Sequence, residues 1–153
     1  MKFFFLFLSM MVSYILKSQT ALFSTDYQEY CIWNDSTSHF ENCQGADEST
    51  LFTLNKTKTQ FIHTTDQSKS AYFIDSWNYD QPNDVYIYKV TSDVGNKYTF
   101  VIDLHHYQIR ILGIDAYGHP YMLKHYIKKY WVENDWYLSN FELTIISILN
   151  ICL

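Results

Sequence analysis

The stretch that decides the fold is VYIYKVTSDVGNKYTFVID, residues 85–103. Two sets of side chains alternate through residues 85–91: Val85, Ile87 and Lys89 would lie on one face, and Tyr86, Tyr88 and Val90 on the other. Residues 97–103 alternate in the same two-residue period, which is that of a β-strand. Between these two runs lies a polar turn that contains Gly95, a residue that tolerates the left-handed backbone of a tight connection. The stretch therefore predicts a β-hairpin.

The chain around this hairpin repeats the same pattern. Short segments rich in Thr, Val, Ile, Tyr and Phe are separated by polar turns about every ten residues, which is typical of an antiparallel all-β domain. Turns at 66–68, 80–84, 92–96 and 115–120 carry Gly, Pro, Asn or Asp. Strands are expected at 51–54, 57–64, 71–77, 85–91, 97–103 and 108–114, with a seventh near 121–130.

Several of these segments are apolar on both faces. Tyr98, Phe100 and Ile102 share one face of their segment, and Val101 lies on the other. A flat sheet with one face in water does not need this arrangement, whereas a curled sheet does. The predicted fold is mainly β, an antiparallel meander curled into a small barrel or half-barrel, with an irregular amino-terminal arm.

The first residues predict a leader. Lys2 precedes an apolar run that reaches Leu16, and polar residues follow it at once. This run of about 14 residues is shorter than the roughly 20 that a membrane-spanning helix needs. Residues 1–19 are therefore expected to be a cleaved signal peptide without a transmembrane anchor, so that the protein is exported to the periplasm or secreted.

Three further stretches follow the leader. Residues 20–50 are polar and turn-rich, and they are expected to form an irregular arm. A Cys31–Cys43 disulfide would pin this arm and restrict the unfolded chain by about 3 kcal/mol. Residues 51–137 form the expected antiparallel β domain, and residues 138–153 are a hydrophobic carboxyl-terminal segment. That segment could be a closing strand, a helix on the sheet, an interface or an artefact of the reading frame. Cys152 within it is left over from the disulfide and could be a small apolar residue, an intermolecular bridge or a reactive thiol.

Charge and motifs exclude several classes of function. Loss of Lys2 and Lys17 with the leader would change the formal net charge from −5 to −7, which disfavours nucleic acid as a partner. Neither a glycine-rich phosphate loop nor a Gly-x-Ser-x-Gly element occurs. The sequence therefore predicts no cofactor and no catalytic residue.

Histidines and aromatic residues are the remaining candidates for a site. His105, His106, His63, His119 and Asp103 could in principle bind a metal, but adjacent strand residues point to opposite faces, so turn and surface histidines without a metal are expected. Tryptophans and tyrosines could cover the sheet or line a concave site for an apolar or sugar ligand. They are Trp33, Trp77, Tyr79, Tyr86, Tyr88, Tyr98, Tyr107, Tyr117, Tyr121, Tyr126, Tyr130, Trp131, Trp136 and Tyr137. The residues selected for ligand binding are Trp77, Tyr86, Tyr88 and Tyr98.

Residues 18–20 at the end of the leader, and the phrases KTQFIHTT (58–65) and VTSDVGN (90–96), resemble small uncharacterised exported proteins of Bacteroidota-type bacteria. The resemblance implies a secreted β-meander and no particular activity. The function predicted is a non-enzymatic binding module for an envelope or extracellular protein or for a small apolar ligand. The alternative is a small secreted hydrolase or metal-dependent enzyme.

Overall fold

A computed structural model describes residues 19–132 of the chain. The predicted leader, the last residues of the expected β domain and the apolar segment 138–153 with Cys152 lie outside the described residues, apart from Gln19. Within residues 19–132, no helix is long and apolar enough to cross a membrane.

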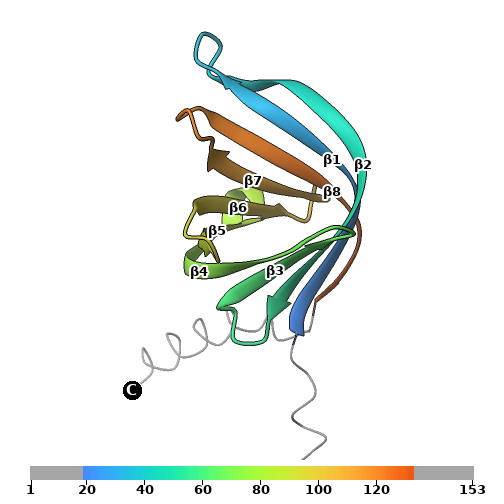
Figure 1. Ribbon diagram of the computed structural model, residues 1–153. Helices are drawn as coiled ribbons and strands as arrows, with labels where there is room; N and C mark the ends of the chain where they lie inside the picture. The colour runs from blue at the N-terminus through green and yellow to red at the C-terminus, as the bar shows by residue number, and fades with distance from the viewer. Residues whose placement is uncertain (1–18, 133–153) are drawn as a thin grey trace, which may run out of the picture.

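The described chain forms one closed antiparallel barrel in which every strand pairs with its neighbours in sequence and the last strand pairs with the first (Figure 1). This confirms the predicted antiparallel all-β fold and shows that the barrel closes. The eight strands are β1 (Gln19–Asn34), β2 (His39–Asn55), β3 (Gln60–Thr65), β4 (Lys69–Asp80), β5 (Val85–Ser92), β6 (Lys97–Asp103), β7 (Gln108–Ile114) and β8 (Pro120–Val132).

Alternation along the strands builds the interior. Side chains at every second position of β5 and β6 point inward, and Tyr88 and Phe100 face each other there as register partners. The turns obey the expected chemistry, because Gly95 and Gly118 have φ values of +88° and +86°, which L-residues with side chains rarely adopt. The buried core contains Ala21, Phe23, Phe52, Leu54, Phe61, Tyr86, Tyr88, Val90, Phe100, Ile102, Ile109, Ile111 and Ile127.

The expectation of an irregular arm at residues 20–50 is wrong. These residues form β1 and most of β2, the two longest strands, which make a hairpin that extends past the ends of the other strands (Figure 1). Residues 42–47 of β2, in the part of the hairpin that extends beyond the other strands, are all open to solvent. A strand exposed on both faces has no apolar alternation from which it could be recognised.

The predicted disulfide between Cys31 and Cys43 is confirmed. It links β1 to β2 across the hairpin, with the two Cα atoms 4.1 Å apart. Cys31 is fully buried, whereas Cys43 is exposed. The bond therefore fastens the extended half of the hairpin, where β2 has no second neighbouring strand among the described residues.

Candidate functional site

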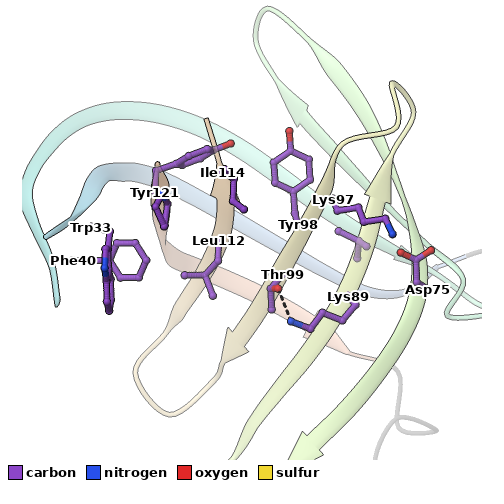
Figure 2. Close-up of a pocket in the computed structure, with 13 residues that line it drawn as sticks. Trp33, Phe40, Asp75, Lys89, Lys97, Tyr98, Thr99, Leu112, Ile114 and Tyr121 are labelled. Atoms are coloured by element: carbon purple, nitrogen blue, oxygen red, sulfur yellow. Dashed lines mark hydrogen bonds between the residues drawn. The ribbon is translucent and has the colours of Figure 1, made fainter. Parts of the chain in front are cut away.

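A groove of about 710 Å³ lies on the outer face of the barrel, where the tip of the β1–β2 hairpin stands beside β5 to β8. Figure 2 shows Trp33 and Phe40 at one end, Asp75 and Lys89 at the other, and Leu112 and Thr99 between them. Ligand sites in proteins commonly enclose about 300–1,000 Å³. The groove is therefore large enough for a small molecule.

The aromatic end of the groove is fixed by contacts within the hairpin. Trp33 and Phe40 are register partners on β1 and β2, and their rings meet edge to face with centroids 5.0 Å apart. The Trp33 indole N–H donates a hydrogen bond to Asp35 over 2.9 Å. Because the Cys31–Cys43 bond lies just below this pair, the apolar wall is held in place rather than left to a free hairpin tip.

The floor of the groove comes from cross-strand pairing. Thr99 on β6 and Leu112 on β7 are register partners, so their side chains emerge from the same face. Leu112 is half-buried, and Ile114 at the end of β7 is 69% exposed. When a ligand covers apolar surface of this kind and removes it from water, the binding free energy becomes more favourable by about 25 cal/mol per Å².

Tyrosines form the rim between the groove and the barrel mouth. Tyr121 stacks on Tyr30 with ring centroids 5.5 Å apart. Burial raises the pKa of Tyr121 to about 12, and the interaction with the neighbouring Tyr98 acts in the same direction. The Tyr121 phenol therefore stays neutral in the physiological range, and it offers the groove a hydroxyl group without charge.

Charged side chains gather at the end opposite the aromatic wall. The Lys89 ammonium donates a hydrogen bond to Thr99 Oγ1 over 2.9 Å, and Asp75 accepts one from Thr91 over 2.7 Å. Lys89 and Lys97 are exposed, and neither takes part in an ion pair with another residue of the described segment. The groove is thus amphipathic along its length, with two cations against one carboxylate at its polar end.

A second hollow of about 460 Å³ continues down the outer face and shares Phe40 and Leu112 with the groove. Its floor ends at Asp103, which accepts hydrogen bonds from the His106 backbone N–H over 2.9 Å and from Arg110 over 3.3 Å. Burial raises the pKa of the Asp103 carboxyl, but the bonds from His106 and the charge of Arg110 outweigh it and leave the pKa lowered. Asp103 therefore holds the β6–β7 turn in shape.

Of the four residues selected from the sequence for ligand binding, Tyr98 lines the groove. Tyr86 and Tyr88 point into the barrel core, where they are 6% and 1% exposed. Trp77 is 45% exposed, but it stacks on Tyr88 at a centroid distance of 6.4 Å and does not line the groove. Tyr98 thus lines the groove, whereas the other three residues do not.

The histidines also divide into two groups. His106 and His119 are exposed in turns and contact Asp103 and Asp115, as expected for turn histidines. His63 departs from the expectation of a surface position, because it is largely buried and stacks on Phe52 with ring centroids 4.5 Å apart. It lies beside the fully buried His125. The register of β3 explains this, since His63 occupies the same face as the core residue Phe61.

Sequence reasoning missed most of the groove. Trp33 and Phe40 lie in the segment expected to be irregular, and Leu112 and Ile114 belong to a strand that reads as ordinary core. Only the curvature of the hairpin brings these residues together, and no local pattern encodes that curvature. Comparisons with protein-family models, with curated proteins and with solved structures gave no match. The fold and site define a closed antiparallel barrel with a lateral amphipathic groove.

Proposed function

We propose that the protein is a non-enzymatic binding protein that holds a small apolar ligand in the groove between the β1–β2 hairpin and the outer face of β5 to β8. The observation that carries this proposal is the groove itself, about 710 Å³ in volume with Trp33, Phe40, Leu112, Ile114 and Tyr121 in its lining. Such apolar walls with few polar groups are typical of small-molecule sites.

The rigidity of the groove supports the same proposal. Its walls are strands rather than loops, and the disulfide fixes the hairpin that carries Trp33 and Phe40. A preformed site spends little of its binding energy on ordering its own side chains. The proposed ligand therefore meets a surface that is already in its binding shape.

We place this binding protein outside the cytoplasm, in the periplasm or the extracellular medium. The Cys31–Cys43 bond supports that location, because structural disulfides persist in oxidising compartments and are rare in the cytosol.

The test is a fluorescence titration with 1-anilinonaphthalene-8-sulfonate, an anionic probe whose fluorescence rises when its apolar aromatic rings leave water. We expect saturable binding to the purified full chain. Leu112→Asn should weaken it about tenfold, because one buried leucine contributes about 1.5–3 kcal/mol and tenfold corresponds to 1.4 kcal/mol. Val94→Asn is the matched control, since Val94 is 78% exposed in the β5–β6 turn and does not line the groove.

The proposal fails if both variants bind the probe as the parent does, or if binding does not saturate. Each variant must first show the parent's far-ultraviolet circular dichroism and unfolding midpoint, so that lost binding is not lost folding. Competition by a panel of unlabelled apolar compounds would then rank the chemical classes that the groove accepts.

A further inference from the structure

Strand β2 pairs with β1 along its whole length, but it pairs with β3 only from Thr50 to Leu54. Residues 39–49 therefore have no second partner strand among the residues that the structure describes. At about 3.3 Å per residue this edge is roughly 36 Å long. Unpaired edges of this kind are templates to which another extended chain can add.

The outward hydrogen-bonding groups of this edge can be assigned from the register. Cys31 and Cys43 face each other with Cα atoms 4.1 Å apart, which marks a non-hydrogen-bonded pair of an antiparallel ladder. The register continues regularly from Tyr30↔Gln44 to Tyr27↔Asp47, so the alternate residues Gly45 and Asp47 are also in non-hydrogen-bonded pairs. Their backbone N–H and C=O groups, like those of Cys43, point away from β1.

The edge is also held in place on β1. The disulfide ties Cys43 to the fully buried Cys31, and the ring of Tyr27 covers Gly45 so closely that a Cβ there would lie 1.7 Å from the phenol oxygen. An aromatic ring laid over a glycine in this way supports a strand that lacks its own side-chain contacts. The edge therefore needs little ordering before it pairs.

Acidic side chains beside this edge favour a basic partner. A hollow of about 390 Å³ lies where β3 diverges from β2, and its lining includes Asp26, Asp47, Glu48 and Asp66. Lys128 contacts Asp26 over 2.9 Å, and the Gln28 amide donates to Glu48, but Asp47 and Asp66 take part in no ion pair within residues 19–132. Charge of one sign along an edge disfavours pairing with a second copy and favours a basic segment.

We propose that the edge of β2 at residues 43–49 docks an extended basic segment of another protein by strand addition, with a lysine or arginine of that segment in the acidic hollow. The surface is separate from the groove, because the hollow shares no lining residue with it. The protein would thus carry two sites, one for a small ligand and one for a peptide strand.

The test uses a fluorescein-labelled peptide of alternating lysine and valine and measures binding to the full chain by anisotropy. Two analogues accompany it, one with N-methyl groups on alternate residues, which removes backbone donors, and one with glutamate in place of lysine. We expect the parent peptide to bind and both analogues to bind at least about tenfold more weakly. Equal binding of the N-methylated peptide would overturn strand addition, and equal binding of the acidic peptide would overturn the choice of partner.

Variants locate the site on the protein. Asp47→Pro removes an outward N–H without removing a bond to β1, and Asp47→Asn keeps the N–H and removes the charge. We expect the proline variant to lose most of the peptide binding. The asparagine variant should lose only the electrostatic part of the affinity, which high salt removes from the parent protein as well. Asp93→Asn, in the exposed β5–β6 turn, is the matched control. Unchanged binding by a folded Asp47→Pro protein would contradict the proposal.

Discussion

The imidazole rings of His63 and His125 lie edge to face inside the barrel, with centroids 5.7 Å apart. His63 Nε2 and both ring nitrogens of His125 have no hydrogen-bond partner within the described residues, and the same holds for the buried hydroxyls of Thr25 and Thr50. Burial lowers the pKa of His63 to about 4, and burial together with the neighbouring His63 lowers the pKa of His125 to about 3. Both rings are therefore neutral in the folded protein at neutral pH.

This pair predicts a loss of stability in mild acid. Each histidine has a pKa near 6.5 when unfolded, so below that value the unfolded chain binds more protons than the folded chain. Stability should fall steadily from about pH 6.5 to about pH 4, by several kcal/mol, because one pKa unit corresponds to about 1.4 kcal/mol. Urea unfolding at a series of pH values measures this directly.

The His125→Phe variant distinguishes the contribution of the buried histidines to the pH dependence of stability from that of the carboxylates. It removes the fully buried titrating group and keeps an aromatic ring, so the slope of stability against pH between about 6.5 and 4 should become shallower. His119→Phe is the control, since His119 is exposed and contacts Asp115 in a turn. If the slope of the His125→Phe protein matched that of the parent, the buried pair would not be the acid-sensitive element.

A close contact between Gly45 and Tyr27 predicts that substitutions of these two residues have non-additive effects on stability. Gly45→Ala places a Cβ 1.7 Å from the present position of the phenol oxygen, so the ring must move and the variant should lose about 1–2 kcal/mol of stability. In a Tyr27→Ala background the same change should cost nothing or stabilise the strand, because alanine suits a strand better than glycine does. Urea unfolding of the four proteins forms a double-mutant cycle, and additive effects would show that the contact carries no energy.

The disulfide predicts a link between the redox state and ligand binding at the groove. Replacing Cys31 and Cys43 by alanine should cost about 2–4 kcal/mol and loosen the hairpin that carries Trp33 and Phe40. We expect weaker binding of the apolar probe at the groove even where the protein remains folded. A reductant should reproduce this effect on the parent and leave the double variant unchanged. Probe binding that survives in the variant would show that the hairpin wall stands without the disulfide.

The sequence predicts strands β5 to β7 better than it predicts the β1–β2 hairpin beside the groove, for a physical reason. Strands β5 to β7 bury one face in the core, and the alternation of residues such as Tyr86 and Tyr88 records that burial. The outer half of the β1–β2 hairpin buries little, so its residues show no period, and it was predicted to be irregular. The groove depends on that hairpin, which explains why Tyr98 is among the four residues selected from the sequence, whereas Trp33 stands only in the wider aromatic set and Phe40 in neither.

The charged end of the groove predicts a preference for anionic ligands. Lys89 and Lys97 outnumber Asp75 there, and all three are exposed, so the expected effect on affinity is modest and sensitive to salt. A paired measurement compares 1-anilinonaphthalene-8-sulfonate with N-phenyl-1-naphthylamine, which has a similar apolar body and no charge. Lys97→Gln should weaken the anionic probe by about two- to fivefold at low salt and leave the neutral probe unchanged. Lys69→Gln provides the control, because Lys69 does not line the groove. An equal loss for both probes would mean that Lys97 contributes its aliphatic stem rather than its charge, and the preference for anions would then be wrong.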